Sequence, residues 1–229
     1  MAGLIDSKRG VIRYSVPLDI KTNTDVSEWI SNAVDAPCFI ENDANCCAWG
    51  ELAFNRSEEF RDFMFALVEC RRGPTSIGTL GGLGVGIGIV LGGKVHSGIH
   101  GTAGEFRSAF CEGPGEMQLS LPKGDLSRYG TDLDVQVRVS DELARNFSML
   151  VNALDFQRVY IGGDIEGLPI DFPSILRQRL EETRMYPFPK GVEIRYSSLG
   201  DRAVAYGATG MTLDRLVTES LLPGLGTGR

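Results

Sequence analysis

Asn42 and Asp43 are the residues of this sequence best suited to chemistry. The Asp43 carboxylate can accept hydrogen bonds from hydroxyl groups or act as a general base, and the Asn42 amide can both donate and accept. The mostly apolar segment 37–40 that precedes them predicts a short buried strand over residues 38–42. A carboxylate at the carboxyl end of such a strand faces the crevice where α/β proteins bind small molecules. These groups therefore predict a site for a polyhydroxy ligand such as a sugar.

Spacing alone favours a structural role for Asp43. We expect a helix from Asp43 to about residue 53, and Asp is common at a helix start because its carboxylate can cap exposed backbone N–H groups. The cap and the binding site involve the same residue, so the sequence leaves both interpretations open.

Glycine occupies alternate positions over residues 82–88. A strand that lacks Cβ atoms on one face lets a phosphate-bearing ligand or a second backbone approach closely. A phosphate site at Gly82, Gly84 and Gly86 and close packing of the strand are therefore equal alternatives.

Two further segments carry polar or glycine residues at expected turns. Glu105 follows the small residues 102–104 on a predicted loop, so its carboxylate can point into a cleft, although a loop Glu is more often solvated. Gly162 and Gly163 end a predicted strand, where they admit a flat ligand such as a nucleobase or form a tight strand-to-helix turn.

Composition excludes several classes of partner. The 229 residues carry a formal net charge of −7, which argues against a nucleic-acid surface and against binding to an anionic membrane. No apolar run approaches the roughly 20 residues of a membrane span, and no signal peptide is visible. The 5 Cys residues form no C-x-x-C pair, which fits a reduced cytoplasm and gives no zinc signature. We expect a cytoplasmic protein without a metal.

The elements that must position these residues fall into two parts. In the first part, a strand over 11–18 precedes a helix whose buried face includes Val26, Trp29, Ile30 and Ala33. In the second part, strands over 63–68, 83–91 and 94–97 are followed by helices and strands in alternation. The later elements are a helix around 143–154, a strand over 158–161, a helix from Pro173, a strand over 192–196 and a helix over 203–217 that is interrupted at Gly207 and Gly210.

This order, βββ-α-β-α-β-α, is the layout of an α/β, ribonuclease H-like fold. We expect residues 1–55 to be the remnant of an N-terminal lobe, residues 56–220 to form a nearly complete C-terminal lobe, and residues 221–229 to be a flexible tail.

Taken in order, these pieces resemble the ROK family of bacterial repressors and sugar kinases. Gly3-Leu4-Ile5-Asp6 is similar to a Pro-Gly-hydrophobic-Asp segment of that family, and residues 41–45 are similar to its Asn-Asp core. The resemblance implies an actin-like ATPase and sugar kinase fold, with sugar hydroxyls held by Asn42, Asp43 and Glu105. It also implies a second phosphate loop at residues 82–88 and adenosine-side glycines at Gly162 and Gly163.

The departures from the family pattern bear on function. No Asp-x-Gly-Gly-Thr phosphate loop precedes Gly3, and Leu83 stands where the kinases carry Thr. Arg107 and Ser108 occupy the positions of a Gly-His pair, and only Cys111 stands in the region of the family's zinc loop. Zinc is therefore not expected, because one Cys cannot build a closed four-ligand site.

These departures favour a binding protein, namely the sugar-sensing effector domain of a ROK-type transcriptional regulator. Such a domain needs no cofactor, forms a homodimer, and contacts DNA only through a segment absent from this chain. The residues expected to hold the sugar or sugar derivative are Asn42, Asp43, Glu105 and Ser108.

Two alternatives stay open. The first is an ATP-dependent, hexokinase- or glucokinase-like sugar kinase truncated at its N-terminus, with Asp43 as the catalytic base and with ATP and Mg²⁺ as cofactors. Its nucleotide-binding residues would be Gly82, Gly84, Gly86, Gly162 and Gly163. The second is a degenerate scaffold in which Arg107 and Ser108 fill the old sugar cleft and only dimerisation survives.

Overall fold

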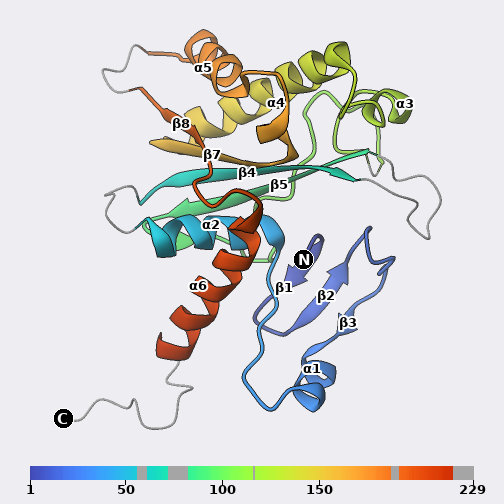
Figure 1. Ribbon diagram of the computed structural model, residues 1–229, viewed down its shortest axis with the longest axis vertical. Coiled ribbons are helices and arrows are strands. Elements are labelled where there is room, and N and C mark those ends of the chain that lie inside the picture. The colour runs from blue at the N-terminus through green and yellow to red at the C-terminus, as the bar shows by residue number, and fades with distance from the viewer. Residues whose placement is uncertain (56–60, 72–81, 116, 187–190, 219–229) are drawn as a thin grey trace.

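A mixed, five-stranded β-sheet forms the centre of the protein (Figure 1). The computed structural model describes residues 1–55, 61–71, 82–115, 117–186 and 191–218. Within them the sheet has the order β6-β5-β4-β7-β8, in which β4, β7 and β8 are parallel and β5 is antiparallel to both of its neighbours. The strands are β4 (Phe63–Arg71), β5 (Gly82–Leu91), β6 (Lys94–Val95), β7 (Arg158–Gly163) and β8 (Glu193–Tyr196).

Helices cover both faces of this sheet (Figure 1). One face carries α3 (Lys123–Leu126), α4 (Leu133–Leu154) and α5 (Phe172–Thr183), and the other carries α2 (Asp43–Phe54) and α6 (Ala203–Thr218). Two short 3₁₀ helices, η1 (Asp164–Gly167) and η2 (Gly200–Arg202), follow β7 and precede α6. The strand order and the two helical layers are those of a ribonuclease H-like fold, which confirms the fold class expected from the sequence.

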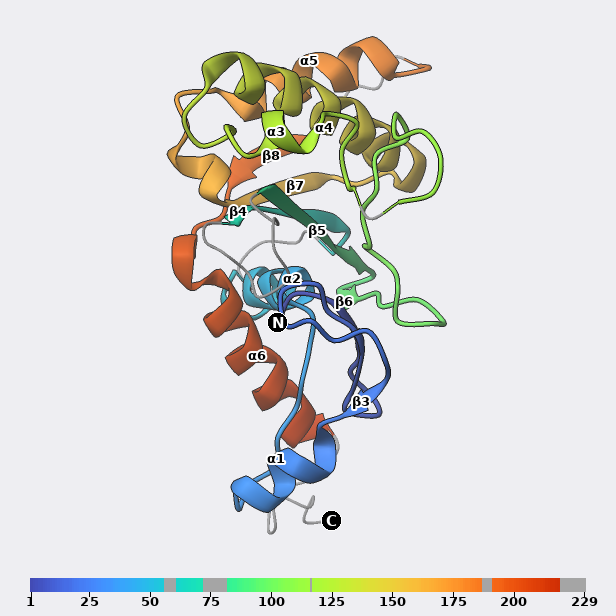
Figure 2. The ribbon, with the colours of Figure 1, turned by 90° about the vertical axis from the view of Figure 1, so that its right-hand side faces the viewer.

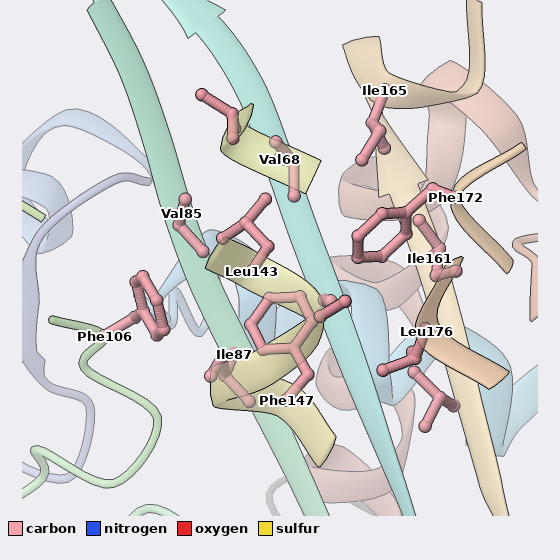
Figure 3. Packing of buried hydrophobic residues seen from close by; sticks show 14 of the residues in the cluster. Val68, Val85, Ile87, Phe106, Leu143, Phe147, Ile161, Ile165, Phe172 and Leu176 are labelled. Carbon is pink, nitrogen blue, oxygen red and sulfur yellow. The ribbon is translucent and has the colours of Figure 1, made fainter. Parts of the chain in front are cut away.

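The side chains of β4 point alternately to the two faces of the sheet, and each face carries its own hydrophobic core. Met64, Ala66 and Val68 point to the larger core under α4 and α5, whereas Phe63 and Phe65 point to the smaller core under α2. Figure 3 shows the larger core, in which aromatic and aliphatic side chains from α4 pack on the faces of β4, β5 and β7. A strand that is apolar on both faces is what a central strand requires.

Capping residues set the ends of the helices that cover the larger core. Asp132 accepts hydrogen bonds from the backbone N–H groups of Asp134 and Val135 at 3.1 and 3.3 Å, so α4 begins ten residues before the first apolar residue that marked it in the sequence. Helix α5 begins at Phe172 with Pro173 in its first turn, as expected.

A second, three-stranded sheet forms the amino-terminal part. It consists of β1 (Leu4–Asp6), β2 (Val11–Tyr14) and β3 (Thr24–Asp25), all antiparallel, and it is followed by α1 (Ser27–Ala33). Ile5, Ile12 and Val26 form its small core. These strands lie on the same side of the five-stranded sheet as α2 and α6 (Figures 1 and 2).

Two expectations for the amino-terminal part are corrected by the structure. Residues 38–42 form no strand, and the ring of Phe39 instead lies 5.1 Å from the guanidinium of Arg215 on α6. The predicted buried face of α1 is only partly right: Val26 is buried before the helix starts and Ile30 packs half-buried on the small core, but Trp29 is 74% exposed and Ala33 is exposed. Apolar spacing over one or two turns was too short a signal to identify the whole buried face.

Gly207 and Gly210 do not interrupt α6. The helix runs without a break from Ala203 to Thr218 and crosses α2 at these glycines. A Cβ atom on Gly207 would overlap the carbonyl oxygen of Cys46, and one on Gly210 would lie 2.7 Å from Cβ of Ala53. The glycines therefore allow the two helices to approach backbone to backbone. The expected flexible tail 221–229 lies outside the described residues.

Candidate functional site

A cavity of about 450 Å³ lies between the two sheets. One wall comes from the amino-terminal part, with Tyr14 and the segment 2–4. The opposite wall comes from β4, β5 and the loop that contains Glu105, and the first turn of α2 closes one end with Asn42 and Asp43. Its volume is within the usual range for small-molecule sites. The cavity brings together three of the four side chains that the sequence predicted to hold a sugar.

Asn42, and not Asp43, is the N-cap of α2. The Asn42 Oδ1 accepts hydrogen bonds from the backbone N–H groups of Ala44 and Asn45 at 2.9 and 3.2 Å. Asp43 is the first residue of the helix, and its Oδ1 accepts from the N–H of Ala44 at 3.0 Å. The Asn42 side chain also donates to the carbonyl oxygen of Gly3 at 3.0 Å. The cap thus ties the start of α2 to the opposite wall of the cavity and leaves the second oxygen of Asp43 for a ligand.

The glycines of β5 bring the first turn of α2 against the sheet. A Cβ atom on Gly86 would lie 2.9 Å from Cβ of Ala44, and one on Gly88 would lie 2.5 Å from the carbonyl oxygen of Ala44. Any side chain at either position would push the helix and its Asp43 away from the strand. Close packing, one of the two alternatives for the glycine-rich segment, is therefore present at Gly86 and Gly88.

Glu105 reaches the same cavity from a loop that is bound to β5. Gly104, whose φ of 91° favours glycine, accepts a hydrogen bond at its carbonyl from the N–H of Ile87 at 3.1 Å, and Glu105 forms an isolated β-bridge with Gly86. The side chain is accessible to solvent within the cavity mouth, but the surrounding protein atoms remove part of its hydration. This desolvation raises the pKa of Glu105, and the charge of Asp43 raises that pKa further.

Arg107 and Ser108, which follow Glu105, take different places. Arg107 lines the cavity, and its guanidinium donates to the carbonyl oxygens of Met117 and Gly113 at 3.3 and 2.6 Å. The structure places Ser108 outside the cavity lining: it is 3% exposed, and its Oγ accepts a hydrogen bond from the amide of Asn146 at 3.1 Å. The expected role of Ser108 in holding sugar has no geometric support, because its hydroxyl is already used inside the protein.

Several polar residues of the cavity wall were not singled out as site residues, among them Gln118, Asn45 and Glu69. Gln118 donates from Nε2 to the carbonyl oxygens of Val85 and Phe106 at 2.6 and 3.1 Å and accepts from the N–H of Val85 at 3.0 Å, so it holds the loop after Glu105 on β5. Asn45 lies one helical position from Ala44, and Glu69 is on β4 beside Gly84. Glu69 and Gln118 carry no sequence signal, because only the pairing of distant segments brings them to the cavity.

Asn45 belongs to a buried network behind the cavity. The Glu41 side chain is 8% exposed and accepts from the N–H of Asn42 at 2.9 Å and from the Asn45 amide at 3.1 Å. Arg215 of α6 pairs with the other Glu41 oxygen at 3.7 Å and donates to the carbonyl oxygen of Ser7 at 3.3 Å. Residues 41–45 are thus held by hydrogen bonds among themselves and by Arg215 of α6.

The predicted nucleotide-binding glycines are not gathered at one place. Gly84 and Gly86 line the cavity, and a Cβ on Gly82 would meet no atom within 4 Å. Gly162 packs against the ring of Phe65, and Gly163, with a φ of 93°, packs against the backbone of Val68. The Leu83 side chain is buried in the larger core. Packing accounts for Gly86, Gly162 and Gly163 without a ligand.

Metal binding and membrane crossing are assessed only for the residues that the structure describes. There, no three His, Cys, Asp or Glu side chains are grouped so as to hold a metal ion. Over the same residues, none of the helices combines the length and apolar character that crossing a membrane requires.

Comparison with known proteins finds one family model and several relatives that match this chain. Residues 1–107 match the model described as ROK family. An uncharacterised protein of Clostridium perfringens is 25% identical over 232 residues, which cover 90% of this chain and 74% of that protein. The Xylose repressor of Bacillus spizizenii is 29% identical over 245 residues, which cover 94% of this chain and 60% of the repressor. The Beta-glucoside kinase of Listeria monocytogenes is 29% identical over 113 residues, which cover 49% of this chain and 34% of the kinase.

Solved structures of ROK family kinases and of a ROK family regulator have a fold similar to that of this chain. A ROK family glucokinase from Streptomyces griseus, in complex with glucose and AMPPNP, gives a TM-score of 0.61 at 20% identity and covers 92% of this chain and 78% of its own. A ROK family transcriptional regulator, a homologue of the E. coli MLC protein, gives a TM-score of 0.58 at 19% identity and covers 93% of this chain and 60% of its own. At these identities the likeness shows the fold alone. The chain spans less than two thirds of the repressor, the regulator and the β-glucoside kinase.

Proposed function

Because this chain belongs to the ROK family, whose relatives here include both a repressor and sugar kinases, we propose that it is the sugar-sensing effector domain of a ROK-type transcriptional regulator. The single observation that supports this proposal is the cavity between the two sheets, which is lined by Asn42, Asp43 and Glu105. Carboxylate and amide groups that converge on a cavity of this size are suited to the hydroxyl groups of a carbohydrate.

The position of the cavity supports a sensing role. Its walls come from the amino-terminal sheet and from the five-stranded sheet, so a ligand that contacts both walls favours one relative arrangement of the two parts. In a homodimeric regulator such a shift changes how the DNA-binding parts are presented. Those parts are expected outside the 229 residues of this chain, whose net charge of −7 does not favour DNA. We expect the regulator to work in the cytoplasm.

Titration calorimetry with a panel of neutral sugars, including glucose, mannose and xylose, tests the proposal. We expect one of them to bind, and we expect Asp43→Asn and Glu105→Gln each to weaken binding by about tenfold or more, since each removes a charged hydrogen-bond acceptor. The exposed Glu28 on α1 provides a matched control, because Glu28→Gln makes the same charge change far from the cavity. Failure of every sugar to bind contradicts a sensing role.

A sugar kinase is the second function that the site supports, because Asp43 lies in the cavity where it could act as a base on a sugar hydroxyl. ATP and Mg²⁺ would supply and neutralise the transferred phosphoryl group. The residues described here fit a nucleotide poorly, since Gly162 and Gly163 are in packing contact and Leu83 brings no hydroxyl. A coupled ATPase assay on the protein with its natural upstream residues decides the matter: turnover that Asp43→Ala abolishes establishes the kinase.

A further inference from the structure

The polar groups that the cavity offers to a ligand are mostly hydrogen-bond acceptors. Asp43 has one carboxylate oxygen without a backbone partner, and the carboxylate of Glu105 has no hydrogen bond to a described residue. Asn45 carries a further acceptor that is buried in the cavity wall. The residue is 6% exposed and lines the cavity, and its Oδ1 has no hydrogen-bond partner among the residues that the structure describes. Its Nδ2 donates to Glu41, which fixes the orientation of the amide.

The usual donors for an anion at such a place are already occupied. The start of a helix of 12 residues would normally offer free N–H groups to a phosphate. Here the N–H groups of Ala44 and Asn45 donate to Asn42, that of Asp43 donates to the carbonyl oxygen of Met1 at 3.2 Å, and that of Cys46 closes the first helical turn. The protein's own acceptors therefore fill the position that a ligand anion would take.

Positive charge in the cavity wall does not offset the carboxylates of Asp43, Glu69 and Glu105. Among the described lining residues the guanidinium of Arg107 is the one cationic group, and it donates to the carbonyl oxygens of Met117 and Gly113. Desolvation raises the pKa of Glu105, and the negative charge of Asp43 raises it further. A cation between Asp43 and Glu105 would relieve the repulsion between them.

We propose that the ligand of this cavity is a carbohydrate with a free amino group, whose ammonium is bound by Asp43 and Glu105. An ammonium has three donors and no acceptor, so it matches a wall of acceptors better than a hydroxyl does. The same charges exclude phosphorylated and carboxylated sugars. This inference rests on the proposed sugar-binding function and narrows its ligand class.

Matched sugars on the unmodified chain test the inference by calorimetry at neutral pH. Glucosamine and mannosamine are each compared with the parent hexose, the N-acetyl derivative and the 6-phosphate. The N-acetyl group keeps the nitrogen and removes its charge, so it separates charge from shape. We expect at least one free amino sugar to bind about tenfold or more tightly than its N-acetyl derivative, with an advantage that shrinks as salt is added, and we expect no binding of the 6-phosphates.

Two variants test whether Glu105 is responsible for the preference for a free amino sugar. Glu105→Gln should abolish most of the preference for the amine while leaving the binding of the neutral hexose less affected, and Glu28→Gln, on the exposed surface of α1, should change neither. Equal affinity for the amine and its N-acetyl derivative, or binding of a 6-phosphate as tight as that of the hexose, overturns the inference and leaves the sugar-sensing function standing. Absence of binding by every sugar in the set overturns both.

Discussion

The first turn of α2 combines a structural and a chemical role in adjacent residues. Asn42 caps the helix and ties it to Gly3, while Asp43 keeps an oxygen free for the cavity. Sequence reasoning recognised the helix start and the carboxylate, but it assigned the cap to the wrong residue. Both side chains are chemically able to cap, and only the backbone conformation decides: Asn42 has a ψ of 145° and is extended, whereas Asp43 is already helical.

Removal of this cap should weaken both the fold and the site. We expect Asn42→Ala to lower the free energy of unfolding by about 1–2 kcal/mol, because the N–H groups of Ala44 and Asn45 lose their acceptor. Urea denaturation measures the loss. Asp132→Ala, which removes the cap of α4 on the far face of the sheet, should cost a similar amount without changing sugar affinity. If the two variants bind sugar equally well, the cap of α2 does not position Asp43.

Glu51 gives a prediction for stability against pH. It is 2% exposed on α2, and burial raises the pKa of its carboxyl although Ser197 donates to it at 2.6 Å. With the folded pKa above the unfolded value, the folded state binds the proton more tightly. The contribution of Glu51 to stability is therefore fully present below the unfolded pKa and is lost as the pH rises through the folded pKa.

We accordingly expect Glu51→Gln to gain stability relative to the parent chain as the pH is raised from about 4 to about 7, because the variant carries no charge to desolvate. Thermal or urea unfolding of both proteins over this range measures the difference. Glu182 on α5 provides the contrast: hydrogen bonds from Gln178 and Arg179 lower its pKa, so Glu182→Gln should show the opposite trend. A stability difference that does not vary with pH contradicts the assignment.

At the scale of elements, helix α2 is packed between β5 and α6 through glycines on both partners. Gly86 and Gly88 of β5 meet Ala44, and Gly207 of α6 meets the backbone of Cys46. These contacts fix the position of Asp43 at the end of the cavity. They also explain why a phosphate loop and a packing surface look alike in sequence, because both need a backbone without Cβ atoms.

Gly207→Ala should test this packing. The added methyl group overlaps the Cys46 carbonyl, so α6 must shift away from α2, and we expect a loss of about 1–3 kcal/mol or more in the free energy of unfolding. Gly124→Ala is a matched control in α3, where a Cβ meets no atom within 4 Å; it should be neutral or slightly stabilising. Equal effects of the two substitutions would show that close approach is not what Gly207 provides.

The elements of the five-stranded sheet were predictable because each carries its own signal. β5 and β6 are joined by Gly92 and Gly93, both with positive φ, and α4 shows its apolar face at Leu143 and Phe147. The amino-terminal part was less predictable. Its strands have two to four residues each, and the segment before Asn42 is held by Arg215, about 175 positions away in the chain. Of the cavity, the sequence indicates Asn42, Asp43 and Glu105, but not Gln118 or Glu69, whose places depend on strand register.

At the scale of the whole molecule, Arg215 connects α6 to the cavity. It reaches the carbonyl oxygen of Ser7, the ring of Phe39 and the buried carboxylate of Glu41. Glu41 in turn orients Asn45 and Asn42. A change in the relative position of the two sheets can therefore be transmitted to α6 through the Arg215 guanidinium and the buried Glu41 carboxylate.

This route predicts that Arg215→Ala acts on the amino-terminal sheet and on ligand binding together. The substitution leaves the Glu41 carboxylate buried without its cation, which we expect to cost about 1–3 kcal/mol. Hydrogen exchange should show faster exchange over residues 4–14 than in the parent chain, with little change in β4 and β7, and sugar affinity should fall. Arg128→Ala, which removes exposed ion pairs beside α3, is the control and should leave both unchanged. Uniform acceleration of exchange over both sheets would mean that Arg215 stabilises the fold as a whole and does not couple α6 to the cavity.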